Sequence, residues 1–381
     1  MVFTKAGVAD PSDAPTYTQW SIEAARKVRG RPDSIVLFDS TIAEPASLLS
    51  DLLQGGLTGS LRDRFVSVFG SGNPQLIAAI AARYELSDDM VLTTTGAISG
   101  LDLLLDMLVV PGRPVLVEQP CFDILPILAA KAGADVRFVD RAYPDYDIDL
   151  EQVERGFAAG AGLLLLTNLH NPTGRHLPDA RLLEIAALAD RFGALVIVDE
   201  VYRGFADPGA CAATLAPNIV TVNSLTKLYG LFSLKCGWVA GDAGLIARLR
   251  THHANRDLGV CKLSHALAAQ VMADSTAFDA HWQSILERTR PVLLSHAAAM
   301  RVDGLIEGDV PPQGCIWFPR LTIPLTGRQV ADNLWQAAGV LPVPGELFGD
   351  GRHIRIGFGA DADRLDRGMG RLHALLRGER P

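Results

Sequence analysis

Two lysines stand in an otherwise almost uncharged stretch, NSLTKLYGLFSLKCGW, which covers residues 223–238. Burial in apolar surroundings disfavours the charged form of a lysine and lowers its pKa. Lys227 and Lys235 are therefore expected either to be exposed after all or to have a chemical role. The chemistry open to a discharged lysine amine is nucleophilic attack on a carbonyl compound, which gives a Schiff base.

Ser224 and Lys227 also match the S-x-x-K element of serine acyl enzymes such as β-lactamases. Those enzymes need S-D-N and K-T-G elements as well. Neither element occurs in the sequence, so the pattern argues against a serine nucleophile.

Short runs of Val, Ile and Leu must position these residues, and they alternate with longer helical patterns over residues 91–241. The predicted strands are VLTT (91–94), PVLV (114–117), LLLLTN (163–168), ALVIVDE (194–200), NIVTVNS (218–224) and GWVAG (237–241). Strands that are apolar on both faces and separated by helices are typical of a mostly parallel sheet covered on both sides. The sequence predicts an α/β domain.

The pattern changes after Gly241, where helical stretches run to about residue 294 and a Pro- and Gly-rich region follows. A strand-like HIRIGF (353–358) precedes a helix whose apolar residues Leu365, Met369, Leu372 and Leu376 share one face. We expect three parts: residues 1–40 as a segment packing with the small domain, residues 41–275 as the large α/β domain, and residues 276–381 as a smaller α+β domain.

Composition narrows the class of protein. The chain has 381 residues, of which 48% are hydrophobic and 20% charged, and this length predicts two domains. The net charge of -8 and the scattered basic residues argue against nucleic acid or an anionic membrane as partner. Five cysteines without a C-x-x-C pattern indicate neither a disulfide framework nor a metal site.

The compartment that we expect is the reducing cytoplasm. The N-terminus lacks an apolar core of signal-peptide length, and no stretch approaches the roughly 18 apolar residues of a spanning helix.

Polar residues follow five of the predicted strands, and α/β domains bind ligands at the carboxyl ends of their strands. These segments are residues 95–97, 118–122, 167–174, 199–202 and 223–227. Taken singly, each is explained by turn chemistry, a helix cap or core packing. Taken together, they fit a cofactor with a phosphate, an aromatic ring with a protonatable nitrogen, and an aldehyde. Pyridoxal phosphate is such a cofactor, since it needs a lysine amine and a carboxylate partner for its ring nitrogen.

The segments HNPTG, DEVYRGF, SLTK and RIGF occur in this order, and with them the chain resembles the fold-type I pyridoxal-phosphate enzymes over about residues 69–358. Within that group it is most similar to the class I and II aminotransferases of the aspartate aminotransferase kind. The resemblance implies the PLP-dependent transferase fold type I, an α/β fold with a mostly parallel seven-stranded sheet between helices in the large domain and a smaller α+β domain. It also implies a homodimer with shared active sites.

The resemblance implies a role for each matching residue. Lys227 would form the Schiff base and move a proton at the substrate Cα, and Asp199 would pair with the pyridinium nitrogen. Asn171 and Tyr202 would hydrogen-bond the phenolic oxygen, and Phe122 would stack on the ring. The catalytic residues would thus be Lys227, Asp199 and Tyr202.

The remaining positions match ligand-binding roles of the family. The phosphate would be held by Gly96, Ala97, Ser224 and Lys235. Arg355 would bind the substrate α-carboxylate, for which a planar bidentate donor is suited.

The sequence departs from the family pattern at three places. Lys235 stands where the family has a phosphate-binding arginine, and it lacks the arginine's fork of two hydrogen bonds. Phe69 is the nearest aromatic to the place of a tyrosine that reaches the neighbouring subunit's phosphate. Thr41 or Ile42 replaces a glycine close to the substrate, so both are expected to narrow the pocket or bind the substrate.

The predicted reaction is ping-pong transfer of an amino group between an L-amino acid and a 2-oxo acid. The departures keep open a second reading, a pyridoxal-phosphate enzyme of the same fold that acts in secondary metabolism as a β-lyase, a cyclase, or a decarboxylating or oxygen-using oxidase. A regulator of this fold would need an N-terminal DNA-binding domain, for which some forty residues leave no room. Substrate choice stays open, because a second, distal-carboxylate arginine could be any of Arg26, Arg29, Arg31, Arg203 and Arg256.

Overall fold

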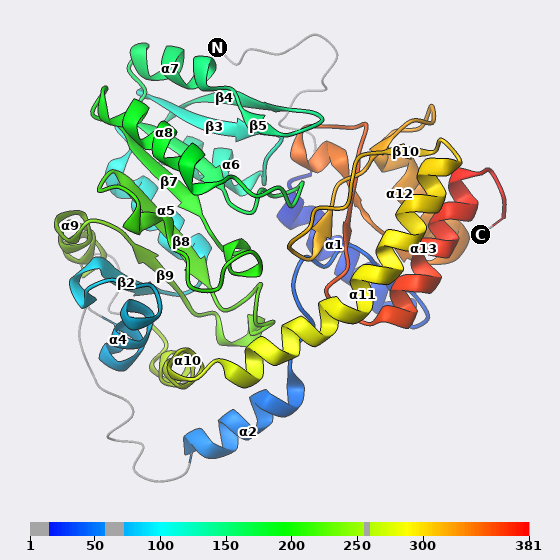
Figure 1. Ribbon diagram of the computed structural model, residues 1–381, viewed down its shortest axis with the longest axis horizontal. Coiled ribbons are helices and arrows are strands. Elements are labelled where there is room, and N and C mark those ends of the chain that lie inside the picture. Colours follow the sequence, from blue (N-terminus) through cyan, green and yellow to red (C-terminus); the bar gives the residue numbers. More distant parts are fainter. Residues whose placement is uncertain (1–14, 58–71, 255–259, 381) are drawn as a thin grey trace.

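The computed structural model describes residues 15–57, 72–254 and 260–380. In these segments no helix combines the length and the apolar character that crossing a membrane requires. Figure 1 shows a large sheet with helices on both faces and, beside it, a smaller group of helices and short strands.

The large sheet has eight strands within the described residues, in the order β2-β9-β8-β7-β6-β3-β4-β5. They are β2 (Val91–Thr94), β3 (Pro114–Gln119), β4 (Asp135–Ala142), β5 (Asp147–Ile148), β6 (Leu163–Thr167), β7 (Leu195–Asp199), β8 (Ile219–Ser224) and β9 (Gly237–Ala240). The neighbours from β4 to β8 are parallel, whereas β9 is antiparallel to β2 and β8, and β5 to β4. The mostly parallel α/β sheet is confirmed, and the two-residue β5 adds an eighth strand to the expected seven.

Helices cover both faces because the strands are apolar on both. Every residue of β2, β6, β8 and β9 is buried. One core layer joins the sheet to α5 (Ala97–Leu108), α6 (Ile124–Lys131) and α9 (Ala243–Ala254). The opposite layer joins it to α7 (Leu150–Ala158) and α8 (Asp179–Asp190). The strand-end residues are thus attached to a sheet that is packed against helices on both faces.

The smaller part lies beside this sheet (Figure 1). Its helices are α11 (Thr276–Val302), α12 (Gly327–Ala338) and α13 (Ala362–Leu376). Its short strands are β10 (Ile306–Glu307), β11 (Ile316–Trp317), β12 (Arg320–Leu321), β13 (Val340–Leu341), β14 (Val343–Pro344) and β15 (Ile354–Gly357). The four apolar residues that the helical period selected in α13 are all buried.

The N-terminal segment contacts the C-terminal part of the chain. It contains α1 (Tyr17–Arg29) and β1 (Ile35–Val36), and β1 pairs in parallel with β13. Three further helices, α2 (Ala46–Leu57), α4 (Pro74–Arg83) and α10 (Lys262–Ala273), complete the described elements longer than one turn. The domain boundaries after residues 40 and 275 stay predictions.

A crossing segment, residues 37–42, follows β1 and runs from the small part to the carboxyl edge of the large sheet. The Gly357 amide donates to the Leu37 carbonyl at 2.7 Å, and the Ile42 amide donates to the Lys227 carbonyl at 3.1 Å. A Cβ on Gly357 would stand 1.5 Å from the Asp39 carbonyl oxygen, so only glycine permits this contact. The crossing segment is thereby fixed against both parts.

Candidate active site

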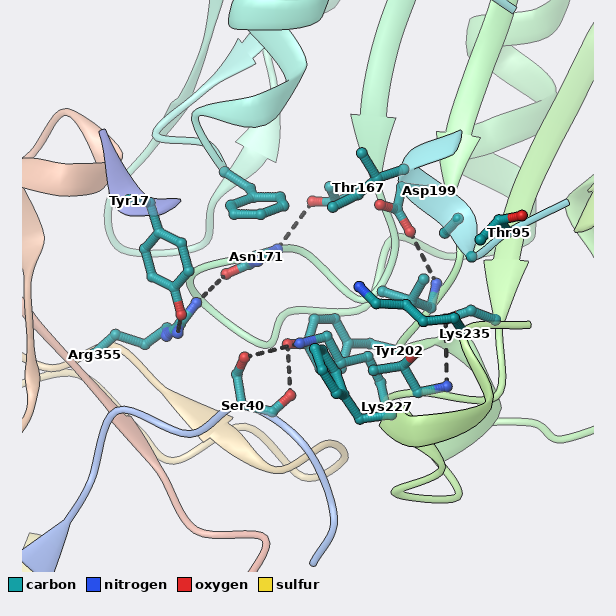
Figure 2. Close-up of a pocket in the computed structure, with 18 residues that line it drawn as sticks. Tyr17, Ser40, Thr95, Thr167, Asn171, Asp199, Tyr202, Lys227, Lys235 and Arg355 are labelled. Carbon is teal, nitrogen blue, oxygen red and sulfur yellow. Dashed lines mark hydrogen bonds between the residues drawn. The ribbon is translucent and has the colours of Figure 1, made fainter. Parts of the chain in front are cut away.

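One pocket lies at the carboxyl ends of β6, β7 and β8, beside the start of α5 (Figure 2). Ten of the twelve residues predicted from the sequence line it: Gly96, Ala97, Phe122, Asn171, Asp199, Tyr202, Ser224, Lys227, Lys235 and Arg355. They come together because parallel strands end at the same edge of a sheet.

Lys227 follows β8, and its side chain is held among oxygen atoms. Its Nζ donates to Ser40 Oγ at 3.1 Å and lies 5.7 Å from the centroid of the Tyr202 ring. The Tyr202 hydroxyl donates to the Ser40 carbonyl at 2.8 Å. Ser40 therefore holds both side chains at one end of the pocket.

The protonation of Lys227 differs from the sequence expectation. Burial works to lower the pKa of this ammonium, but the Tyr202 and Tyr17 hydroxyls act in the opposite direction, and the pKa lies above its usual value. The decrease in the Lys227 pKa that the sequence leads us to expect is wrong, because the side chain ends among polar groups rather than apolar ones.

Asp199 ends β7 and faces the pocket with a buried carboxylate. Burial raises its pKa to about 6, although the Val201 amide, which donates to Oδ1 at 3.1 Å, and the charge of Lys227 both work to lower it. In the described structure no cation lies within hydrogen-bonding distance of this carboxylate. A protonated ring nitrogen would supply that cation, so Asp199 fits the pyridine ring of pyridoxal phosphate.

A buried ion pair supports the floor of the pocket. The Thr167 hydroxyl accepts from the Asn171 amide at 2.9 Å and donates to Glu118 Oε1 at 2.5 Å. Glu118 Oε2 accepts from Arg141 at 2.8 Å, and both side chains are buried. Burial raises the pKa of Glu118 despite the opposing charge of Arg141. This network fixes the loop that carries Asn171.

Arg355 enters from β15 and carries a fully buried guanidinium. It donates to Asn171 Oδ1 at 2.9 Å and to the Tyr17 hydroxyl at 2.6 Å, and its Cζ lies 4.8 Å from the centre of the Phe348 ring. Its Nε has no hydrogen-bond partner among the residues that the structure describes. No carboxylate of the described chain forms an ion pair with it, so this buried cation fits a ligand carboxylate.

The opposite end of the pocket fits a phosphate. Helix α5 begins at Ala97 after Gly96, whose φ of 82° favours glycine, and its amide groups and dipole favour an anion. A Cβ on Gly237 would lie 2.7 Å from the Ala97 nitrogen, so glycine lets β9 approach the helix start. Ser224 and Lys235 also line this end, and Lys235 Nζ lies 4.5 Å from the centroid of the Phe232 ring.

Thr41 and Ile42, the two other predicted residues, do not line the pocket. The Thr41 hydroxyl donates to the Thr226 carbonyl at 2.6 Å, and Ile42 is buried in the hydrophobic core. Their assignment to substrate binding is corrected, because the crossing segment turns Ser40 toward the pocket and uses Thr41 to hold the loop of Lys227.

Sequence reasoning missed Ser40, Thr167 and Tyr17, all of which line the pocket. Thr167 belongs to the strand-end segment of residues 167–174, whereas no motif in the sequence marks Ser40 or Tyr17 as a site residue. Of the five arginines considered for a distal carboxylate, the four that the structure describes lie outside the pocket lining; they are Arg26, Arg29, Arg31 and Arg203. Arg256 and Phe69 lie outside the described residues.

Comparisons with known proteins identify the family of the chain. The family model of aminotransferase class I and II matches residues 44–372. Capreomycidine synthase of Streptomyces vinaceus is 28% identical over 310 residues, which cover 80% of this chain and 79% of that protein. An aspartate aminotransferase of Streptomyces avermitilis is 26% identical over 332 residues, covering 80% of each protein.

Solved structures share the fold. Aspartate aminotransferase from Thermus thermophilus with maleate has a TM-score of 0.84 and 20% sequence identity, and the match covers 95% of this chain and 97% of that one. Since the family model spans most of the sequence, the chain belongs to the class I and II aminotransferases, which are pyridoxal-phosphate-dependent enzymes of fold type I.

Proposed function

We propose that this pocket binds pyridoxal phosphate and transfers an amino group between an L-amino acid and a 2-oxo acid in a ping-pong reaction. The bound cofactor would supply an aldehyde for the amino group and a ring that stabilises negative charge developing at the substrate Cα. Lys227 would hold the aldehyde carbon, and Gly96, Ala97, Ser224 and Lys235 the phosphate. Phe122 would lie against the ring.

Other side chains of the pocket would bind the cofactor ring and the substrate and would transfer the proton. Asp199, ionised beside a protonated ring nitrogen, would keep that nitrogen charged. Asn171 and Tyr202 would bind the phenolic oxygen, and Arg355 would orient the substrate by its α-carboxylate. Once released, the Lys227 amine would carry a proton from and to the substrate Cα.

The observation that carries this proposal is the meeting of three unlike groups in one pocket. The lysine amine comes from the loop after β8. The buried carboxylate, which has no cationic partner among the described residues, comes from β7, and the buried guanidinium comes from β15. A Schiff-base cofactor with a cationic ring, acting on a carboxylate substrate, uses all three.

The test compares wild type with Lys227→Ala after each is incubated with pyridoxal phosphate. Wild type should show a visible absorption band that borohydride fixes to the protein, and the variant should retain no cofactor after borohydride and gel filtration. With a reactive amino acid, wild type should form one keto acid per site and leave pyridoxamine phosphate. Equal fixation in both proteins would show that Lys227 is not the anchor.

A second candidate function is favoured by two observations. One relative is named a synthase rather than an aminotransferase, and Lys235 replaces the arginine that the resemblance leads us to expect. A cyclase or lyase of the same fold would convert an amino acid without forming pyridoxamine phosphate. Mass spectrometry of the products therefore separates the two reactions.

We also propose a homodimer that completes the site. Ile98 and Phe232 line the pocket, yet they are 50% and 58% exposed, and a second copy would cover this apolar rim. Light scattering on the purified protein should give twice the mass of one chain. For the compartment we propose the cytoplasm, on the basis of five unpaired cysteines. For the domains we propose the boundaries given above.

A further inference from the structure

We propose that Tyr17, from the N-terminal helix α1, is a second donor to the substrate carboxylate and works beside Arg355. This inference rests on the proposed function, in which Arg355 binds that carboxylate. It adds a residue on a segment for which the sequence predicted only packing with the small domain.

The position of Tyr17 places its hydroxyl in the pocket. Its side chain lines the pocket opposite Lys227, and Arg355 Nη2 donates to its hydroxyl oxygen at 2.6 Å (Figure 2). Because the guanidinium is the donor, the Tyr17 proton is left for an acceptor. A carboxylate next to Arg355 would be such an acceptor.

The surroundings of Tyr17 hold it in this orientation. Its backbone amide donates to Asp123 Oδ2 at 2.6 Å, directly after the ring-stacking candidate Phe122. The two rings meet edge to face, with centroids 5.3 Å apart and planes at 86°. Thr16 caps the helix through a capping box with Gln19. The backbone bond and the helix cap thus fix the start of α1, and the Phe122 ring orients the phenol, which pre-organises it for a ligand.

The charges near Tyr17 favour donation. Burial works to raise the pKa of the phenol, but the nearby cations Arg355 and Lys227, and the Ser21 hydroxyl, lower it below its usual value. A phenol with a lowered pKa is a stronger hydrogen-bond donor. Tyr17 and Arg355 thus form a neutral and a charged donor side by side, and both the amino acid and the 2-oxo acid carry the carboxylate that they would bind.

The experiment uses the holoenzyme and two probes without side-chain specificity. Propionate carries a carboxylate but no amine, and ethylamine carries an amine but no carboxylate. Each is titrated by calorimetry or by the cofactor's absorption into wild type, Tyr17→Phe, Arg355→Lys and the control Tyr143→Phe. Tyr143 is partly exposed and lies outside the pocket lining, so its variant removes a hydroxyl without touching the site.

Tyr17→Phe should raise the dissociation constant of propionate about tenfold, the loss of one hydrogen bond to a charged group. The KM of the best amino acid and of its 2-oxo acid should rise similarly, with kcat within about threefold of wild type. Ethylamine binding, cofactor content and melting temperature should match those of Tyr143→Phe. Retention of the ring in phenylalanine isolates the hydroxyl from the packing.

Two results would overturn the inference in different ways. If Arg355→Lys weakens propionate binding and Tyr17→Phe does not, the carboxylate site stands and Tyr17 has no part in it. An equal loss of propionate and ethylamine in Tyr17→Phe would mark a general disturbance of the pocket and also exclude a donor role. If neither variant changes propionate binding, the assignment of Arg355 in the proposed function fails.

Discussion

Replacing Asp199 with asparagine should stabilise the protein without cofactor and weaken its hold on the cofactor. In the folded chain, burial raises the pKa of this carboxyl to about 6, against its usual 3.8. Well below pH 3.8 the carboxyl is protonated in both the folded and the unfolded states, so it does not affect the free energy of unfolding. Above pH 6 the folded chain must keep a charge that the unfolded chain holds more easily.

The magnitude follows from the two pKa values. At 1.36 kcal/mol per pKa unit, the ionised carboxylate costs the folded apoprotein about 3 kcal/mol above pH 6. Asparagine has a similar shape, carries no charge and can still accept from the Val201 amide. With an unfolding entropy of about 2.1 cal/mol/K per residue, Asp199→Asn should raise the apoprotein's melting temperature by about 4 °C at pH 8.

The assay is calorimetric melting of apoprotein at several pH values from 4 to 8. The gain should shrink as the pH falls below 6 and be mostly lost at pH 4, because only below the unfolded pKa of 3.8 is the carboxyl neutral in both states. With cofactor present the sign reverses, because a buried partner of the ring nitrogen is lost, and the dissociation constant of pyridoxal phosphate should rise about 100-fold or more.

A control and a refuting result complete this test. Asp149→Ala removes the N-cap of α7, whose carboxylate accepts from the Gln152 amide at 3.0 Å, and should destabilise the protein by about 1 kcal/mol at pH 8. If Asp199→Asn lowers the apoprotein's melting temperature at pH 8, or shifts it equally at every pH, the carboxylate is not strained by burial and the reasoning fails.

Three further changes test other parts of the site. Glu118→Gln leaves the buried Arg141 charge without its partner and should lower the free energy of unfolding by about 3 kcal/mol. The control Glu154→Gln removes an exposed ion pair and should lower it by less than about 1 kcal/mol. Similar melting temperatures of the two variants would contradict this. Lys235→Arg supplies a guanidinium that can donate two parallel hydrogen bonds to the phosphate, so it should slow cofactor release by about tenfold, measured after dilution. Faster release would show that the loop accommodates lysine and not arginine. Gly237→Ala puts a Cβ 2.5 Å from the backbone at the start of α5 and should weaken cofactor binding while leaving the dissociation constant of propionate within a factor of two.

The sequence alone determined the strand-end part of the site. Lys227, Asp199 and Asn171 each follow a run of apolar residues, and parallel strands covered by helices must end at one edge. Their meeting is a consequence of strand direction, which does not depend on the details of side-chain packing. The start of α5, which we propose to bind the phosphate, could be placed from the sequence because it follows β2 directly.

Tertiary structure decided which residues of the N-terminal segment reach the pocket. Ser40, Thr41 and Ile42 are consecutive, and their side chains point to the pocket, the Lys227 loop and the core, respectively. The orientation of these three residues is set by backbone hydrogen bonds to residues distant in the sequence, such as the one from the Ile42 amide to the Lys227 carbonyl. Tyr17 reaches Arg355 across 338 positions of sequence for the same reason. The local sequence pattern cannot encode such contacts, because each depends on how segments distant in the sequence lie against each other.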